Sequence, residues 1–171
     1  MFSRLVQWCS RRPLIVHAHC DIPCGIYDPH AAQIAALTVV RMNQLIAELP
    51  PLGPQSTPEE RVTVIHKLSR YTAVKEHHAE FVKRELRVIW GDYFTPDHVK
   101  QMPELHTLFF EAMKLASKTR TDISLQAAND LLAKIQKIAE LFWKSKGAET
   151  KLQLSQHKAG GQLLYPVPKA A

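Results

Sequence analysis

The sequence has no apolar run long enough to cross a membrane. A spanning helix needs ~18–20 consecutive apolar residues, whereas Arg, Lys or Gln interrupts the apolar stretches of this 171-residue chain well before that length. Glycine is also scarce, with 6 residues, which excludes collagen-like and low-complexity proteins. Almost no alternation of polar and apolar residues is present, so no convincing β-strand is predicted. What remains is one globular domain with 46% hydrophobic residues, enough to bury a core.

Cysteine is nearly absent as well. The three cysteines, Cys9, Cys20 and Cys24, all lie at or before position 24. They are too few and too clustered to form the disulfide framework of a domain this size. A reducing compartment, a metal site or a redox pair fits them better.

Acidic residues are absent from residues 1–18, which hold Arg4, Arg11 and Arg12. A secretory signal would follow its charges with ~7–15 apolar residues, but Arg11-Arg12-Pro13 interrupts them here. A removable leader of another kind remains open, and the cytoplasm is the expected location. The chain carries 22 Lys and Arg against 16 Asp and Glu, a net charge of +6, and without the three leader arginines the charge falls to +3. The remaining cations are dispersed, so neither nucleic acid nor a membrane is an expected partner.

Apolar residues recur every three or four positions over most of the remaining chain, which is the period of an amphipathic helix. A capping box, Thr57-Pro58-Glu59-Glu60, starts the second of the expected helices. Ile65 in this helix and Leu125 in the last one are among the residues expected in the core. The expected helices run from Asp28 to about Leu49, from Pro58 to near Gly91, from about Pro103 through Leu115, and from Asp122 or Ser124 to Gly147. This pattern predicts an all-α fold, an antiparallel four-helix bundle, followed by an irregular tail over residues 148–171.

Two thiols and an imidazole lie close together just before the first expected helix, in His19-Cys20-Asp21-Ile22-Pro23-Cys24-Gly25-Ile26-Tyr27, called the hook below. Pro23 and Gly25 flank Cys24 and favour a tight turn that can bring both sulfurs to one point. On these residues alone a metal-binding hook, a redox pair or local disulfide, and incidental thiols all stay open. A zinc half-site fits less well, because zinc knuckles usually space their cysteines by two residues and no further cysteine completes the ligand set.

The segment HCDIPCGIYDP resembles the metal-binding hook of nickel superoxide dismutases, and it matches the family pattern His-Cys-x-x-Pro-Cys-Gly-x-Tyr at every fixed position. The resemblance continues through WGDYFTP at 90–96, MPELHTLF at 102–109 and IQKIAELFWKSK at 135–146. It covers roughly residues 19–147. The family's fold is also a four-helix bundle.

The resemblance implies that the chain is an enzyme, an oxidoreductase that disproportionates superoxide to O2 and H2O2. A leader, residues 1–18, would be removed by a processing protease so that His19 becomes the first residue. One nickel ion per subunit would be held by the amine of His19, the backbone amide and thiolate of Cys20 and the thiolate of Cys24, a square-planar set that suits Ni(II). On oxidation to Ni(III) the imidazole of His19 would add as an axial ligand.

The resemblance also assigns roles near the metal. Tyr27 and Tyr93 correspond to tyrosines that limit access to it, and both are expected to gate substrate and to relay protons. Pro23, with a cis bond after Ile22, is expected to turn the hook.

Gly25 is expected to support the same turn, and Asp21 and Asp92 are expected to position the hook.

The family's assembly implies a homohexamer. A second hypothesis is a nickel chaperone or storage protein, which would share the ligands but need no turnover.

One departure from the family concerns the surroundings of the axial imidazole. Ala35 stands where the family often has a Glu that orients this imidazole. An Arg that supports it in the family would correspond to Arg70, although a length difference in the second helix leaves this alignment open. His66, His77 and His78 on that helix are interpreted as surface histidines rather than as a second metal site.

Overall fold

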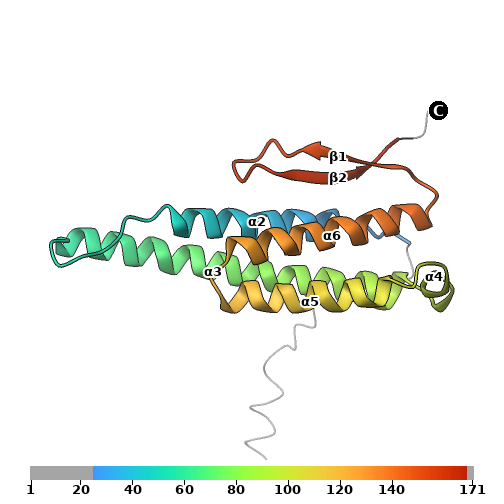
Figure 1. Ribbon diagram of the computed structural model, residues 1–171, viewed down its shortest axis with the longest axis horizontal. Helices are drawn as coiled ribbons and strands as arrows, with labels where there is room; N and C mark the ends of the chain where they lie inside the picture. Colours follow the sequence, from blue (N-terminus) through green and yellow to red (C-terminus); the bar gives the residue numbers. More distant parts are fainter. Residues whose placement is uncertain (1–24, 169–171) are drawn as a thin grey trace, which may run out of the picture.

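Five α-helices and a two-stranded sheet make up residues 25–168, the part of the chain that the computed structural model describes (Figure 1). The long helices are α2 (His30–Ala47), α3 (Pro58–Val88), α5 (Leu105–Thr121) and α6 (Leu125–Ser145). Helices α2 and α5 each pack against both α3 and α6, so the long helices enclose one core. None of the helices described is long and apolar enough to cross a membrane. The mostly helical fold expected from the sequence is confirmed.

Local capping signals set the helix starts. Thr57 Oγ1 accepts a hydrogen bond from the Glu60 N–H at 3.2 Å, and the Glu60 carboxylate accepts one from the Thr57 N–H at 2.9 Å. The predicted capping box is therefore confirmed at the start of α3. At the start of α6, Ser124 Oγ accepts a hydrogen bond from the Ala127 N–H at 3.2 Å, which satisfies one of the donors that a helix leaves unpaired at its first turn.

Two residues expected in the core are at the surface instead. Ile65 is 59% exposed and Leu125 is 41% exposed. The first turns of α3 extend beyond α5 and α6 (Figure 1), so these two helices leave that end of α3 uncovered. Leu125 is the first residue of α6, where only one side of the helix meets its neighbours. The helical period of the apolar residues was predicted correctly, but which of these residues are buried depends on how far the neighbouring helices extend.

The connection from α3 to α5 also differs from the expected stop near Gly91. Residues Ile89–Tyr93 continue α3 as a π-helix, η1, and the Phe94 N–H donates to the Ile89 carbonyl oxygen at 3.2 Å. A short helix, α4 (Pro96–Gln101), follows. A π-turn inserts one extra residue per turn and is found frequently at functional sites. Here the π-helix ends at Tyr93.

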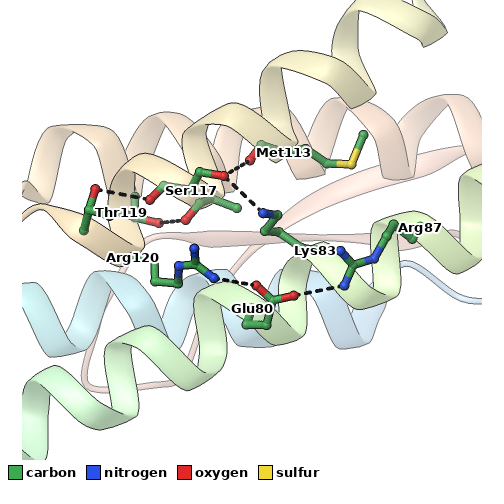
Figure 2. Close-up of polar contacts among 9 residues, drawn as sticks. Glu80, Lys83, Arg87, Met113, Ser117, Thr119 and Arg120 are labelled. Carbon is green, nitrogen blue, oxygen red and sulfur yellow. Dashed lines mark hydrogen bonds and ion pairs between the residues drawn. The ribbon is translucent and has the colours of Figure 1, made fainter. Parts of the chain in front are cut away.

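A polar seam joins α3 to α5 (Figure 2). Glu80 accepts hydrogen bonds from Arg87 of the same helix and from Arg120 of α5, both at 3.0 Å. Lys83 Nζ donates to Ser117 Oγ at 3.1 Å. The hydrogen bond from Arg87 holds the pKa of Glu80 below its ordinary value. Because these groups are partly exposed, each pair contributes little to stability, and the seam mainly favours one register of α5 along α3.

A buried lysine ties α3 to the end of α5. Lys75 is only 1% exposed, and its Nζ donates to the carbonyl oxygens of Thr119 at 2.7 Å, Arg120 at 3.1 Å and Asp122 at 2.7 Å. The last carbonyl groups of a helix have no partner within the helix, and the negative end of the helix dipole lies there. Burial lowers the pKa of Lys75. The lysine therefore acts as a C-terminal cap supplied by another helix.

The C-terminal segment forms a β-hairpin that covers α2 and α6 (Figure 1). Strand β1 (Thr150–Leu154) pairs antiparallel with β2 (Gln162–Pro166), with Leu152 opposite Leu164. The expectation of an irregular tail over residues 148–171, and of no strand at all, is therefore wrong for these two segments. The sequence shows no alternation because burial does not alternate in β2: the neighbours Leu163 and Leu164 are both buried. Contacts with helices distant in the sequence stabilise the hairpin.

Candidate active site

The described residues begin at Gly25, near the C-terminal end of the hook. Gly25 has a φ angle of +73°, in the left-handed region that side chains other than hydrogen disfavour. No atom lies within 4 Å of the position that a Cβ would take there. The backbone conformation, and not a lack of space, requires glycine at this position. The remaining predicted hook residues lie outside the described residues: His19, Cys20, Asp21, Pro23 and Cys24.

The two tyrosines expected to gate the metal lie side by side. The ring centroids of Tyr27 and Tyr93 are 5.6 Å apart, and the ring planes are inclined by 56°. Tyr27 directly follows the glycine and isoleucine of the hook and precedes α2, whereas Tyr93 is the last residue of η1. Tyr27 is the hook residue with a side-chain hydroxyl, and the structure brings it next to Tyr93.

The hydroxyl of Tyr93 belongs to a short hydrogen-bond chain. Its oxygen lies 2.7 Å from Ser145 Oγ, and Ser145 Oγ donates to the carbonyl oxygen of Phe142 at 2.7 Å. A serine hydroxyl has a single proton. Because that proton goes to Phe142, the Tyr93 hydroxyl must be the donor to Ser145. The lone pairs of the Tyr93 oxygen then remain available as acceptors.

Aromatic rings and a cation surround Tyr93. Its ring centroid lies 4.5 Å from that of Phe142 and 5.6 Å from that of His98, which is stacked on it with an angle of 12°. Lys146 Nζ lies 5.2 Å from the Tyr93 centroid and 5.1 Å from the Phe142 centroid. A cation at this distance is attracted to the ring face, and here it places a positive charge beside the tyrosine pair.

Sequence reasoning did not single out Ser145 or Lys146. Both lie at the end of the segment IQKIAELFWKSK, which carried part of the resemblance. Their position next to Tyr93 follows from the packing of η1 against the C-terminal end of α6, which no local pattern reveals. Asp92, predicted to position the hook, is exposed and pairs with no residue between 25 and 168. Its role stays a prediction.

Ala35, the site of the missing carboxylate, faces α3. It is buried and lines a cavity of about 370 Å³ between α2 and α3, together with Ala31, Ile34, His77, His78 and Phe81. Arg70 does not line this cavity and is exposed. The α3 side chains that line this cavity with Ala35 are His77, His78 and Phe81. A role for Arg70 beside the axial imidazole stays a prediction, because His19 lies outside the described residues.

His78 has a defined tautomer in this cavity. Its Nδ1 lies 2.9 Å from the carbonyl oxygen of Val74, which can only accept a hydrogen bond. Nδ1 therefore carries a proton, and in the neutral ring Nε2 is the free acceptor. The cavity thus offers a polar group next to Ala35 that the sequence analysis assigned to the surface.

The donor chemistry restricts where a metal can bind. No group of three or more His, Cys, Asp or Glu residues within 25–168 could hold a metal ion. All cysteines of the chain lie before this range, and two of the three, Cys20 and Cys24, lie in the hook, so the hook is the candidate site for a metal with thiolate ligands. Thiolate and nitrogen donors fit a borderline-soft metal such as nickel better than Mg²⁺ or Ca²⁺, which prefer oxygen ligands.

Comparison with known proteins agrees with this site. The family model of nickel-containing superoxide dismutase matches residues 14–146. A superoxide dismutase (Ni) of Streptomyces seoulensis is 42% identical over 136 residues, which are 78% of this chain and 92% of the relative. The corresponding protein of Streptomyces coelicolor is 37% identical over the same coverage.

Solved structures show the same similarity. A crystal structure of Ni-containing superoxide dismutase with the ligation of the oxidised state has 36% identity and a TM-score of 0.65, covering 76% of this chain and 100% of that one. An apo structure of nickel superoxide dismutase has 31% identity and a TM-score of 0.61, covering 72% of this chain and 100% of that one. With the tyrosine pair at the end of the hook and a family match over most of its length, the chain belongs to the nickel-containing superoxide dismutase family.

Proposed function

We propose that this chain is a superoxide dismutase that uses nickel bound by the hook to convert two superoxide anions and two protons into O2 and H2O2. The observation that carries this proposal is the contact between Tyr27 and Tyr93 where the hook joins α2. In a member of this family, that contact places two phenol groups at the end of the segment that holds Cys20 and Cys24.

His19, Cys20 and Cys24 are the residues that would hold the nickel. Cleavage between Ala18 and His19 would free an amine. This amine, the His19 imidazole, the amide nitrogen and thiolate of Cys20 and the thiolate of Cys24 would supply the nickel ligands, and such nitrogen and thiolate donors suit nickel. When bound, the metal supplies one-electron oxidation and reduction between Ni(II) and Ni(III).

The tyrosine pair handles access and protons. Because the Tyr93 hydroxyl donates to Ser145, its oxygen can accept a hydrogen bond from a water molecule and so orient that water toward the hook. The rings of Tyr27 and Tyr93 lie at the C-terminal end of the hook, where they would limit access to the metal. Lys146 raises the local concentration of an anionic substrate.

Several further properties belong to this proposal. The long helices would form an antiparallel four-helix bundle, with the hook at one end, and the subunits would assemble as a homohexamer. A leader-processing protease would act on residues 1–18, and the enzyme would work in the cytoplasm. Asp21, Pro23, Gly25 and Asp92 would support the geometry of the hook.

Native mass spectrometry tests the proposal most directly. The protein would be purified from cells that supply nickel and the processing protease, so that one spectrum reports the N-terminus, the metal and the assembly. We expect subunits that begin at His19 and carry one nickel ion each. Subunits that keep residues 1–18, or that begin at His19 with zinc or a disulfide in place of nickel, would contradict the proposed function.

A nickel chaperone or storage protein would give the same spectrum. It would not need phenol groups next to the hook, whereas the enzyme does. Loss of turnover with full nickel content after replacement of both tyrosines therefore favours the enzyme. Nickel content without any turnover in the unchanged protein would favour the chaperone.

A further inference from the structure

The β-hairpin lies outside the part of the chain that the family model matches. That match ends at residue 146, and β1 begins at Thr150. The hairpin nevertheless packs on α2 and α6 (Figure 1). It contacts α2 at Gln33, in the first turns directly after the hook, and at Gln44, near the end of the helix.

Gln33 makes the central contact. Its Nε2 donates to the carbonyl oxygen of Leu164 at 3.0 Å, and its Oε1 accepts a hydrogen bond from the Leu164 N–H at 2.8 Å. The side chain is fully buried. A buried amide is stable only when its donor and its acceptor are both paired, and here a single residue of β2 pairs both. The contact therefore allows only one register of the hairpin along α2.

A second contact lies closer to the hook. The ring centroid of Tyr165, in β2, is 5.2 Å from that of His30, the first residue of α2. The His30 N–H donates to Asp28 Oδ1 at 2.8 Å, and the Gln33 N–H donates to the Pro29 carbonyl oxygen at 3.2 Å. The segment from Asp28 to Gln33 is thus held by its own hydrogen bonds and by the strand that lies over it.

The hairpin is itself held at its other end. Gln44 Nε2 donates to the carbonyl oxygen of Ala159 at 3.0 Å, and Gln136 Nε2 of α6 donates to the carbonyl oxygen of Gln162 at 2.6 Å. Leu163 is buried against the helices. The hairpin is therefore a rigid support with contacts on two helices, and not a flap attached only through residue 148.

We propose that the hairpin of residues 150–166 positions the hook, with Gln33 and Tyr165 as the positioning residues. They hold the first turn of α2 against β2, and this turn determines where Tyr27 meets Tyr93. The expected effect on nickel binding rests on the proposed function, whereas the positioning of residues 27–30 by the hairpin does not. Both residues act on the hook through residues 27–30, the segment that joins it to α2.

The test compares Gln33→Leu with Gln153→Ala in the processed protein, which begins at His19 and includes the hairpin. The leucine removes both hydrogen bonds to Leu164 at nearly constant volume, whereas Gln153 is an exposed residue of β1. Amide hydrogen exchange of the metal-free protein is measured over residues 27–33 and over α5. The rate of nickel release to a chelator is measured for the loaded protein.

For Gln33→Leu we expect exchange in residues 27–33 to become about tenfold faster, because opening this segment no longer has to break the hydrogen bonds to Leu164. Exchange in α5 should not change. Nickel release should become several-fold faster. Tyr165→Ala, which removes the ring contact with His30 and keeps both hydrogen bonds of Gln33, should show the same pattern with smaller changes. Gln153→Ala should match the wild type.

Unchanged exchange in residues 27–33 in both variants would overturn the proposal. An equal acceleration throughout α5 would also overturn it, because the contact would then stabilise the whole helical fold and not the root of the hook. If the wild-type protein binds no nickel, the proposed function fails, but the exchange measurement still decides whether the hairpin positions residues 27–33.

Discussion

The side-chain oxygens of Tyr93 and Ser145 lie 2.7 Å apart, and the tyrosine is the donor because Ser145 gives its own proton to the Phe142 carbonyl oxygen. This direction matters for a reaction that consumes protons. A tyrosine that donates into the protein presents only lone pairs to the solvent side. It can orient a water molecule, but it must exchange its hydrogen bond before it can deliver its own proton.

Ser145→Ala should therefore change turnover without changing the metal site. The Tyr93 hydroxyl would lose its acceptor and rotate freely, and a lost hydrogen bond of about 1 kcal/mol corresponds to a roughly fivefold lower kcat. Pulse radiolysis measures the rate, and metal analysis checks the nickel content. Ser145→Thr keeps the hydroxyl and serves as the control. Equal rates for the alanine variant and the wild type would show that this hydrogen bond has no part in turnover.

Replacement of Tyr27 and Tyr93 together by Phe removes both hydroxyls and keeps both rings. We expect dismutation to fall at least about tenfold, since positioned proton donors and acceptors contribute strongly to such reactions. Nickel content should remain at one ion per subunit. Tyr71→Phe on α3 is the matched control, because this tyrosine lies outside the ring cluster around Tyr93. A double variant as fast as the wild type would remove the tyrosines from the mechanism.

Gly25→Ala should weaken the hold of the hook on its metal. At a φ angle of +73° an alanine is strained by roughly 1–2 kcal/mol, so the hook must shift to relieve the strain. We expect nickel release to a chelator to become about fivefold faster or more. Gly53→Ala is the control, because that glycine has no positive φ and also has open space around it. Identical release rates for the two variants would contradict the role of Gly25.

Lys75→Met should destabilise the fold without affecting the nickel site. The change leaves the carbonyl oxygens of Thr119, Arg120 and Asp122 without their shared donor, at a cost of about 1–3 kcal/mol. Each kcal/mol lowers the Tm of a chain this size by about 2–4 °C, which calorimetry detects. Lys67→Met, at an exposed position of the same helix, should leave the Tm nearly unchanged. A Tm for the Lys75 variant equal to that of this control would show that the buried cap contributes nothing.

Helix positions could be predicted from the sequence because their signals are local. The capping box of Thr57 and Glu60 depends only on residues within one turn, and it is present as predicted. The same holds for Ser124 at the start of α6. The apolar period also located the long helices, but it could not show which helix faces other elements cover. Ile65 was therefore expected in the core although it is 59% exposed.

The sequence by itself determined which side chains the hook offers: two thiols, an imidazole, and a glycine directly after Cys24. Only the tertiary structure decided what surrounds the root of the hook. Ser145 and Lys146 reach Tyr93 because η1 packs on the end of α6, and Gln33 finds Leu164 because the hairpin folds back over α2. Contacts between residues so far apart in the chain leave no periodic pattern, since each depends on the packing of whole elements and not on the spacing of neighbours.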